Sequence, residues 1–566
     1  MRTTLASLVV LAALAVPASS ALARTTDKTI VNVAGTTAGF AGDGGPAAQA
    51  QLDAPSDIAF LSPTSFVIAD FNNDRVRLVR SDGTIVTAAG GSRGLSGDGG
   101  PATSAQLDRP SGVTSLPGGG YLVADTFNHS IRRVAPDGTI TTVAGTTRGL
   151  SGDGSGATKA QLSFPSDTAV LPGGGFLVAY TGNDRIRRVG PDGTITTVAG
   201  TSRGFGGDSG PANAASLNQP HDIAIATDGA ILIADTGNDR VRRVDPDGTI
   251  STVAGVGGGF AGDGDPARSA RLHAPFSVAA LPHRGFLFAD TANNRVRRVT
   301  PLGAIFTVAG GAAGNAGNGG LAKTALLNQP GAVTVAPGGG FLVADTGNAT
   351  VRRVSDVGAV PAAVFGRSVG VAPAVGGVTV RPAGVPAFLA LQEEDLVPSR
   401  SDVESTGGQI AITTARDASG AQQTAQLYRG PFSVAYRATG STAFRLAPLT
   451  GCGAGAARVA KPRVGARIAA VTDKRGKAKR KKKPRRKIAS HQLWVSETGG
   501  NWQTATGAVS AAAIGTRWHT TLSCEGTRVT IAQGIVRVRD KLHQRTVVLR
   551  AGQTYLAQTR RSHRGQ

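Results

Sequence analysis

Apolar and polar positions repeat along this chain at a fixed interval of 55 residues. Each copy contains four apolar runs of about five or six residues, separated by turns rich in Gly, Pro, Asn and Asp. No run carries the helical period over the roughly ten residues that a helix needs. The proline before the first run of each copy lies at Pro55, Pro110, Pro165, Pro220, Pro275 and Pro330. Such regularity indicates one supersecondary unit used six times.

The second copy illustrates the unit. Its apolar runs cover residues 111–116, 121–124, 131–134 and 139–145, which predicts an antiparallel meander of four strands. A lone sheet of this size cannot bury both faces, whereas six sheets arranged radially can, and they leave few open edges. The sequence therefore predicts an all-β fold, a six-bladed β-propeller of four-stranded antiparallel blades. A β-solenoid is the other repeat fold, but its coils are usually shorter.

The fourth strand occurs once more than the other three. An extra copy at residues 29–35 precedes the first full unit, and the seventh copy, at residues 359–366, is degenerate. We therefore expect residues 29–35 to pair with the third strand of the sixth blade, around residues 350–354, and to close the ring.

An acidic residue recurs in the long connection between copies. It lies at Asp43, Asp98, Asp153, Asp208 and Asp263, with Asn318 in the sixth copy. A Gly follows each of them except Asp208, where Ser209 precedes the Gly, and Pro-Ala usually comes soon after. This pattern predicts a structural turn leading into one helical turn that the Asp caps. A cation ring is the alternative, but each loop offers a single carboxylate whereas calcium takes about six to eight oxygens.

A second acidic position and a basic position recur later in each copy. The acids are Asp70, Asp125, Asp235, Asp290 and Asp345, with Tyr180 in the third copy. The basic residues are Arg77, Arg132, Arg187, Arg242, Arg297 and Arg352. Asp and Asn suit a tight turn, and each arginine lies on a returning strand within reach of an acid. The alternative is an arginine ring that binds an anionic ligand.

One face of the propeller should carry the long connections. Turns of an antiparallel blade alternate between the two faces, so the long connection and the turn between strands two and three share a face. Binding sites concentrate on such loops. Five apolar residues occupy one loop position there, Phe40, Leu95, Leu150, Phe205 and Phe260, with Asn315 in the sixth copy. They form either a recognition surface or anchors under their loops.

These motifs resemble a known repeat. The segments "VAGTTAGFAGDGGPAAQAQLDAPSDIAF" and "VIADFNNDRVRLV" resemble the long-form NHL repeat of bacterial extracytoplasmic proteins and of teneurin-like surface proteins. The resemblance covers about residues 29–366. Tyr180, Asn318 and Ser155-Gly156, where the third copy loses its proline, depart from it.

Support for catalysis is slight. His129, His221, His273 and His283 share no register and no metal-ligand spacing, and no G-x-S-x-G, H-E-x-x-H or phosphate loop is present. No cofactor or metal is expected. Propellers related by this resemblance include lyases and hydrolases, so an extracellular lyase or hydrolase is the alternative function.

The first 23 residues have the features of a signal peptide. Arg2 precedes an apolar run at 5–16, and Ala21-Leu22-Ala23 is a small-x-small cleavage site. The run is shorter than the roughly 20 apolar residues of a membrane span. We therefore expect a secreted or extracellular protein without a transmembrane span. Export makes a disulfide between Cys452 and Cys524 the expected state of the two cysteines.

Positive charge is concentrated in the C-terminal part. Residues 367–566 hold 32 of the 60 Lys and Arg but 10 of the 37 Asp and Glu. Lys474 to Lys487, "KRGKAKRKKKPRRK", contains 11 basic residues and no acid. Such a block repels itself and is typical of a disordered segment. It is either a solvated insert or a contact for anionic surface polymer. Because no aromatic residue is interleaved, sequence-specific nucleic-acid binding is not expected.

The C-terminal part also alternates as strands do. We place the propeller at 24–366, a linker at 367–410 and a basic β-rich domain at 411–566 with a disordered insert at 472–489. Residues 515–518, Gly534 and residues 551–553 resemble the periplasmic domain of FecR-like proteins. The expected function is an exported binding or scaffold protein whose long-loop face recognises an unknown protein or glycan. A cell-wall protein held by its basic segment is a further possibility.

Overall fold

The structure is a computed structural model of the chain. It describes residues 28–281 and 285–355 and, beyond them, the segments 368–381, 389–391, 395–398, 402–415, 422–428, 432–436, 442–446, 490–497, 502–505, 509–513, 517–523, 526–533, 535–541 and 543–558. The predicted signal peptide, Cys452, Cys524 and the basic segment 474–487 lie outside these residues.

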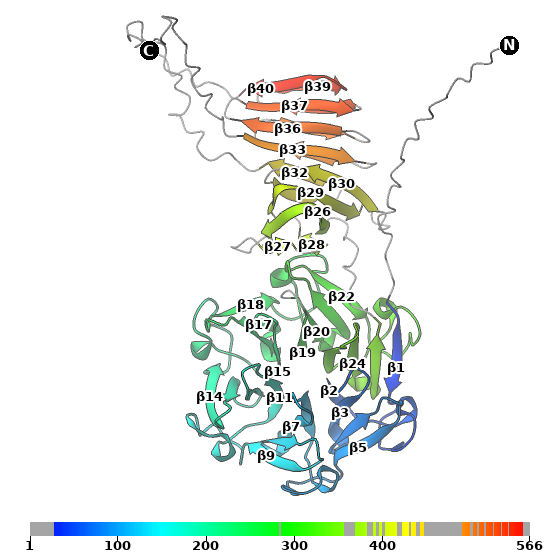
Figure 1. Cartoon of the computed structure of the whole chain (residues 1–566), viewed down its shortest axis with the longest axis vertical. Coiled ribbons are helices and arrows are strands. Elements are labelled where there is room, and N and C mark those ends of the chain that lie inside the picture. Colours follow the sequence, from blue (N-terminus) through cyan, green and yellow to red (C-terminus); the bar gives the residue numbers. More distant parts are fainter. Residues whose placement is uncertain are drawn as a thin grey trace, which may run out of the picture.

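Six antiparallel sheets form a ring (Figure 1). The first blade is β2 (Pro55–Phe60), β3 (Phe66–Asp70), β4 (Arg75–Val79) and β5 (Ile85–Gly90). The second is β6 (Pro110–Ser115), β7 (Tyr121–Asp125), β8 (Ser130–Val134) and β9 (Ile140–Ala144). The third is β11 (Pro165–Val170), β12 (Phe176–Tyr180), β13 (Arg185–Val189) and β14 (Thr194–Ala199), with the short β10 (Ser155–Gly156) beside β14.

The remaining blades repeat this order. The fourth is β15 (Pro220–Ile225), β16 (Ile231–Asp235), β17 (Arg240–Val244) and β18 (Ile250–Ala254). The fifth is β19 (Pro275–Ala280), β20 (Phe286–Asp290), β21 (Arg295–Val299) and β22 (Ile305–Gly310). The sixth is β23 (Ala332–Val335), β24 (Phe341–Asp345), β25 (Thr350–Val354) and β1 (Ile30–Ala34). The predicted all-β fold and six-bladed propeller are therefore confirmed.

The first strand of each blade lies nearest the axis. These strands contact one another in the order β2, β6, β11, β15, β19 and β23, and β23 contacts β2 again. The apolar cores lie between neighbouring blades: one joins Val67 and Val76 of the first blade with Val113 and Val123 of the second. Because each blade buries both faces in this way, each strand can be short and mostly apolar.

The ring closes as the repeat count predicts. β1 pairs antiparallel with β25, with Ile30 opposite Val354 and Asn32 opposite Arg352. Ile30 and Ala34 are fully buried in the two cores that flank the sixth blade. The prediction that residues 29–35 supply the fourth strand of this blade is therefore confirmed, and the degenerate copy at 359–366 lies outside the described residues.

The long connection follows the outer edge of each blade. In the first blade Pro46 forms a bridge with Thr84 at the beginning of the fourth strand, and Ala47 N donates to Gly83 O at 2.9 Å. A single 3-10 turn follows. These turns are η1 (Ala47–Gln49), η3 (Ala102–Ser104), η5 (Ala157–Lys159), η6 (Ala212–Ala214), η8 (Ala267–Ser269) and η11 (Ala322–Thr324). Similar turns after the second strands are η2 (Phe71–Asn73), η4 (Thr126–Asn128), η7 (Thr236–Asn238), η10 (Thr291–Asn293) and η12 (Thr346–Asn348).

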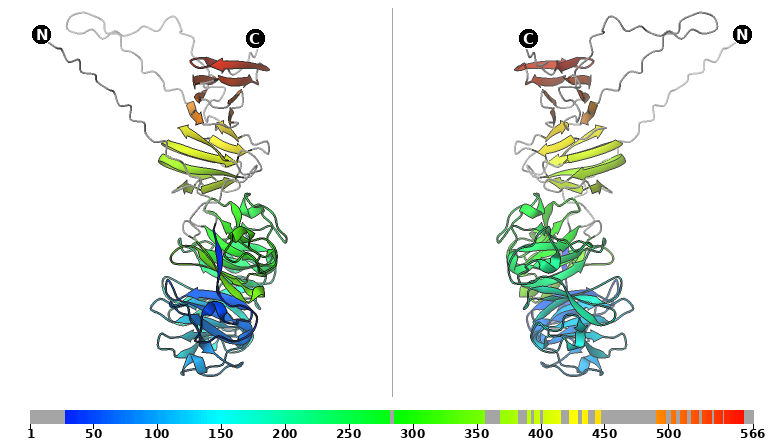
Figure 2. Two further views of the ribbon diagram at one scale, coloured as in Figure 1. Left: turned by 90° about the vertical axis from the view of Figure 1, so that its right-hand side faces the viewer. Right: turned by 90° about the vertical axis from the view of Figure 1, so that its left-hand side faces the viewer.

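A second β region follows the propeller (Figure 2). Its strands form one sheet in the order β39-β38-β35-β34-β32-β31-β29-β30-β33-β36-β37-β40, with β26 beside β27, β28 and β29. The segment predicted as a linker contains β26 (Ser368–Arg381), β27 (Leu389–Leu391), β28 (Asp395–Pro398) and the beginning of β29 (Asp402–Ala415).

The later strands largely match the alternating segments. They are β30 (Gln422–Tyr428), β31 (Phe432–Tyr436), β32 (Thr442–Leu446), β33 (Ser490–Glu497), β34 (Trp502–Ala505), β35 (Val509–Ala513), β36 (Arg517–Ser523), β37 (Gly526–Gln533), β38 (Ile535–Asp540), β39 (Arg545–Arg550) and β40 (Thr554–Gln558). In the part of the chain that the structure describes, no helix is long and apolar enough to cross a membrane.

Candidate functional site

The long connection and the turn between the second and third strands meet on one face, as predicted. In the first blade, Asn73 Nδ2 donates to Gly39 O at 2.8 Å, near the beginning of the connection. Asp53 N, near its end, donates to Asp70 Oδ1 at 2.7 Å. The second blade repeats this with Asn128 and Gly94. We call this the long-loop face.

Six buried arginines hold this face together. Arg77 Nη2 donates to Asp43 Oδ1 at 2.6 Å, and Nη1 donates to Asp70 Oδ2 at 3.4 Å and to Gln51 O at 3.1 Å. The same register brings Arg132, Arg187, Arg242, Arg297 and Arg352 into the interior, each at most 1% exposed. The predicted pairing of arginine and acid therefore exists. The guanidinium groups bind the protein's own loops, so the alternative of an arginine ring open to an anionic ligand does not fit their burial.

The buried acids of this network have raised pKa values. Burial raises the pKa of Asp70 to about 6 and that of Asp125 to about 7, and hydrogen bonds from backbone N–H groups, asparagine and arginine offset part of the effect. Asp235, Asp290 and Asp345 are shifted in the same direction for the same reason. These are structural acids inside the blades.

The loop acids do not cap the helical turn, so that prediction is wrong. The turn η1 begins after Pro46 and receives no side-chain cap. Asp43 instead accepts from Arg77 and from Thr87 Oγ1, the latter at 2.7 Å. Its equivalents Asp98, Asp153, Asp208 and Asp263 pair with the arginines of their own blades. Sequence alone did not show this partner, because the two residues are 34 positions apart.

Two of the three departures from the repeat, Tyr180 and Asn318, change this network. In the third blade the Arg187 guanidinium lies 5.6 Å from the ring centre of the buried Tyr180, which takes the place of an acid. In the sixth blade Asn318 accepts from Asn32 N at 2.5 Å, and Nη2 of Arg352 has no hydrogen-bond partner. The sixth arginine therefore lacks the loop carboxylate that the other five have.

The five apolar loop residues are exposed. Phe40, Leu95, Leu150, Phe205 and Phe260 are 42–50% exposed. Where the residue is Phe, an arginine at the beginning of the third strand lies against the ring: Arg75 over Phe40 at 3.7 Å, Arg240 over Phe205 at 3.9 Å and Arg295 over Phe260 at 3.6 Å. The rings are thus held in place while one side stays accessible. We call these five residues the apolar rim.

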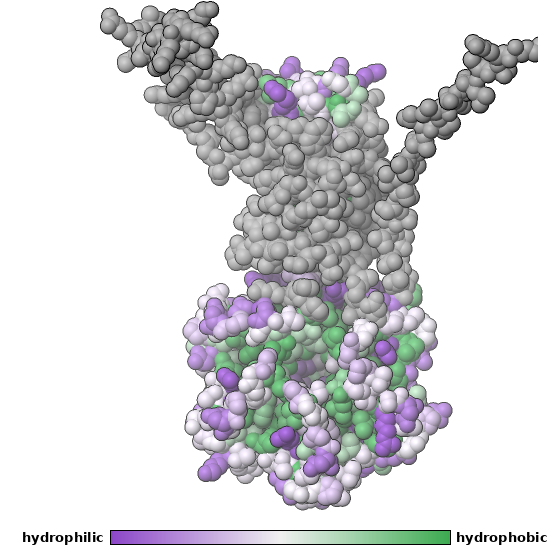
Figure 3. All heavy atoms as spheres, in the orientation of Figure 1, coloured by the Kyte–Doolittle hydropathy of each residue, from purple (hydrophilic) through white to green (hydrophobic). Residues whose placement is uncertain are grey.

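A second aromatic group crosses the first three blades and does not repeat. Phe71 and Phe127 lie 6.3 Å apart, Phe127 and Phe164 5.3 Å apart, and His129 and Phe164 4.8 Å apart, between ring centres. The Arg109 guanidinium lies 5.0 Å from Phe127, and that of Arg148 lies 5.0 Å from Phe164. The sequence did not predict this group, although each of its aromatic members differs from the residues at the same register in the other copies. Figure 3 shows apolar side chains around the hollow of the ring on the face in view.

Polar side chains join the first strands around the axis. A bulge at Ser56 turns two successive side chains toward the next blade: Ser56 Oγ donates to Ser111 O at 2.8 Å, and Asp57 Oδ2 accepts from Val113 N at 2.8 Å. Asp167 and Asp222 repeat the second bond, to Ile223 N and Val278 N. Burial and the charge of neighbouring carboxylates raise the pKa of Asp57 and of Asp167, and burial raises that of Asp222 to about 6.

Among the described residues, His129, His221 and Tyr180 do not come together as a catalytic group. His129 contacts Phe164, His221 stacks on Phe276 at 3.5 Å between ring centres, and Tyr180 is buried beside Arg187. Burial lowers the pKa of His221 to about 3, so it is neutral at physiological pH. No group of three or more His, Cys, Asp or Glu side chains among the described residues is arranged to hold a metal ion.

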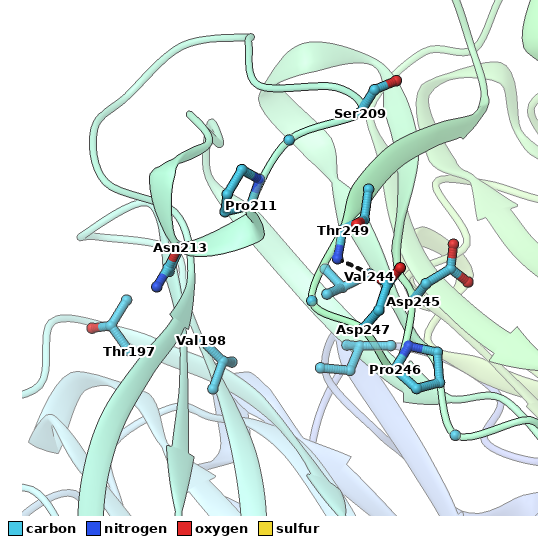
Figure 4. A pocket seen from close by; sticks show the side chains of 14 residues that line it. Thr197, Val198, Ser209, Pro211, Asn213, Val244, Asp245, Pro246, Asp247 and Thr249 are labelled. Atoms are coloured by element: carbon cyan, nitrogen blue, oxygen red, sulfur yellow. Dashed lines mark hydrogen bonds between the residues drawn. The ribbon is translucent and has the colours of Figure 1, made fainter.

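A surface cavity of about 610 Å³ lies between the third and fourth blades (Figure 4). Val198, Ile231 and Val244 line it together with Asp245 and Asp247. Asp245 is paired with Arg243 at 2.8 Å, and Asp247 accepts from Thr249 N at 2.9 Å. With both carboxylates engaged and no nucleophile beside a base, the cavity offers no evident chemistry.

Comparison with known proteins agrees with the repeat. Residues 217–244 match the family described as NHL repeat. Teneurin-1 of Mus musculus is 31% identical over 232 residues, which are 36% of this chain and 8% of teneurin-1. Teneurin-4 of Homo sapiens is 31% identical over 229 residues, again 36% of this chain and 8% of the relative. The chain thus spans a small fraction of the curated relatives that it matches.

The solved structures that match this chain are more distant. An auxiliary nutrient binding protein from Bacteroides ovatus is 17% identical, with a TM-score of 0.44 over 58% of this chain and 76% of that chain. Virginiamycin B lyase from Staphylococcus aureus is 16% identical, with a TM-score of 0.35 over 58% of this chain and 99% of that chain. Likenesses at this level say nothing of ligand or activity.

Proposed function

We propose that this NHL-repeat β-propeller is an exported binding protein that recognises a protein or glycan with its long-loop face. The observation that carries the proposal is the apolar rim, five large apolar side chains at one register, each 42–50% exposed. Apolar residues gathered on one face of a soluble domain are typical of a recognition surface. The rim spans several blades, so it suits a macromolecule better than a small metabolite.

The scaffold beneath the rim favours binding over catalysis. The arginine network anchors every long connection to its own blade through contacts of 2.6–2.8 Å to the loop acid in the first five copies. A rigid frame lowers the entropy lost when the loops bind a partner. The alternative of a lyase or hydrolase has no comparable support, because the candidate catalytic residues do not come together.

The C-terminal part would hold the protein at a surface. Its basic segment 474–487 would contact anionic cell-wall polymer. The FecR-like character of the region after this segment stays a prediction from the sequence resemblance. Secretion and the Cys452–Cys524 disulfide are likewise part of the proposal. In this arrangement the propeller faces its ligand while the basic segment supplies non-specific attachment.

The experiment compares three forms of the mature chain on an array of glycans and extracellular protein domains. One form is unchanged, one has the apolar rim replaced by Ser, and one carries Leu61→Ser. Leu61 is 37% exposed and lies in a short turn between first and second strands, so it is the matched control. We expect the rim variant alone to lose specific binding. Equal binding by all three forms would contradict the proposal.

A further inference from the structure

The repeat supplies an internal comparison for one arginine of the long-loop face. Arg93 and Arg148 occupy the same register in successive copies. Arg93 Nε lies 3.1 Å from Asp108 Oδ1 and 3.7 Å from Asp74 Oδ2, so two carboxylates neutralise it. One copy later these two acids are replaced by His129 and Ser163. Among the described residues Arg148 forms no ion pair, and the acid near His129, Asp108, is already bound to Arg93.

Aromatic rings take the place of the missing acids. Phe164 lies 5.0 Å below the Arg148 guanidinium, and Phe127, which is 39% exposed, lies 5.3 Å from Phe164. Arg109 lies over Phe127 at 5.0 Å; it too has no ion pair in the described residues, and its Nε has no hydrogen-bond partner. Two guanidinium groups without carboxylates therefore flank one exposed ring, Phe127, and the half-buried ring of Phe164.

His129 contributes a hydrogen-bond donor rather than a charge. Its Nδ1 accepts from Phe164 N at 3.3 Å, which places the proton of the neutral ring on Nε2. Burial and the nearby Arg148 lower the pKa of His129. The equivalent residue in the first copy, Asp74, accepts the same backbone bond from Arg109 N at 2.9 Å with a carboxylate. The exchange of Asp for His keeps the fold and removes a negative charge from the surface.

We propose that Arg109, Phe127, His129, Arg148 and Phe164 form a subsite for a carboxylate-bearing sugar, a uronic acid residue of an acidic polysaccharide. The inference rests on the proposed function and names the ligand class for one part of the long-loop face. A guanidinium binds a carboxylate through paired hydrogen bonds, and the apolar face of a pyranose packs against an exposed aromatic ring. A uronic acid presents both groups on one ring.

The blades around the subsite disfavour a peptide that binds by strand addition. The outer edge of the second blade is already paired where Pro101 meets Thr139, and that of the third where β10 meets β14. An incoming strand would have to displace these pairings. Side-by-side rings and guanidinium groups need no such rearrangement to hold a sugar.

The test titrates the full mature chain with tetragalacturonate and with its methyl ester, which differs by the loss of the carboxylates. Arg148→Gln is compared with Arg93→Gln, the matched variant in the copy where the arginine is neutralised. Phe127→Ala removes the exposed ring. Each titration is repeated with residues 474–487 replaced by a neutral Gly-Ser segment, so that the basic segment cannot mask the subsite. Thermal unfolding checks that the variants fold.

We expect tetragalacturonate to bind, its methyl ester not to bind, and Arg148→Gln and Phe127→Ala to weaken binding about tenfold or more, while Arg93→Gln leaves it unchanged. Equal affinity of Arg148→Gln and the unchanged chain would overturn the inference. So would polyglutamate binding with the same dependence on Arg148, which would make the ligand an acidic peptide. If the array ligands bind through the apolar rim and tetragalacturonate does not bind, the inference fails alone and the proposed function stands.

Discussion

Ile30 of β1 lies directly opposite Val354 of β25, so the N-terminal strand of the described chain completes the last blade of the ring. Ile30 is fully buried between the fifth and sixth blades, whereas the next residue, Val31, is 40% exposed. The closure of the propeller therefore depends on a few buried side chains of one short strand.

The first prediction follows from this pairing. Ile30→Ala should lower the free energy of unfolding by about 3 kcal/mol, because it leaves a cavity in a packed core. Val31→Ala, on the exposed side of the same strand, should change it by less than about 1 kcal/mol. Urea unfolding followed by fluorescence measures both. Similar effects of the two substitutions would argue against a closing role for the buried side of β1.

The sixth copy offers a stabilising substitution. Asn318→Asp would give Arg352 Nη2 the loop carboxylate that it lacks, and we expect it to raise the free energy of unfolding by about 1 kcal/mol. The mirror substitution, Asp43→Asn, removes the partner of Arg77 and should lower it by a similar amount. Chemical unfolding of the two variants tests the pair. A loss of stability in Asn318→Asp would mean that the network does not act as described.

The carboxylates near the axis predict a dependence of stability on pH. The pKa of Asp222 rises from 3.8 to about 6 on folding, and those of Asp57 and Asp167 also rise. The folded chain therefore holds these protons more tightly than the unfolded chain. This contribution to stability is present below about pH 4 and is lost as pH rises through about 6. His221 acts in the opposite direction: burial lowers its pKa from 6.5 to about 3, so it is neutral in the folded chain but protonated in the unfolded chain below about pH 6.5, and its contribution to stability falls as pH falls.

Asp167→Asn tests this source of pH dependence. The substitution removes one carboxylate from the group and leaves His221 in place, so the free energy of unfolding at pH 6 relative to that at pH 4 should be higher than in the unchanged chain, by an amount on the order of 1 kcal/mol. Asp82→Asn is the control: Asp82 is exposed, and hydrogen bonds from Thr84 lower its pKa, so it titrates below the window. An unchanged pH profile for Asp167→Asn would show that folding does not raise the pKa values of these acids.

The fixed register of the 55-residue repeat explains why most of the propeller could be predicted from the sequence. The prolines of the repeat fall at the beginnings of the first strands from β2 to β19, and the spare fourth strand at residues 29–35 predicted the partner of Val354. The apolar rim was also found as one loop position. These features follow from one copy of the unit and its repetition, so they need no knowledge of how neighbouring blades meet.

The features that sequence missed depend on contacts across the fold. Asp43 looked like a cap because Gly and Pro follow it, yet the loop folds back onto its blade and Arg77 takes the carboxylate. The second aromatic group depends on a contact between two blades, that of Phe127 with Phe164. A systematic reading of departures from register, such as His129 where four of the other five copies have Asp or Asn, would have indicated this group but not its packing.

The basic segment predicts binding that depends strongly on salt. The mature chain should be retained on heparin or teichoic acid at low salt and released as salt rises, because exposed charges are screened over about 8 Å at physiological ionic strength. A neutral Gly-Ser segment of equal length in place of 474–487 should abolish retention and leave the melting temperature unchanged. Equal retention of the two forms at low salt would show that the segment is only a solvated insert.

The location of the bound partner tests the central claim most directly. Hydrogen–deuterium exchange of the mature chain, measured with and without any ligand retained on the array, reports which backbone segments become protected. We predict protection in the long connections, residues 36–54 and their equivalents, and in the turns that follow the second strands. Protection confined to the short turns, such as residues 61–65 and 80–84, or to the C-terminal β region would contradict the assignment of recognition to the long-loop face.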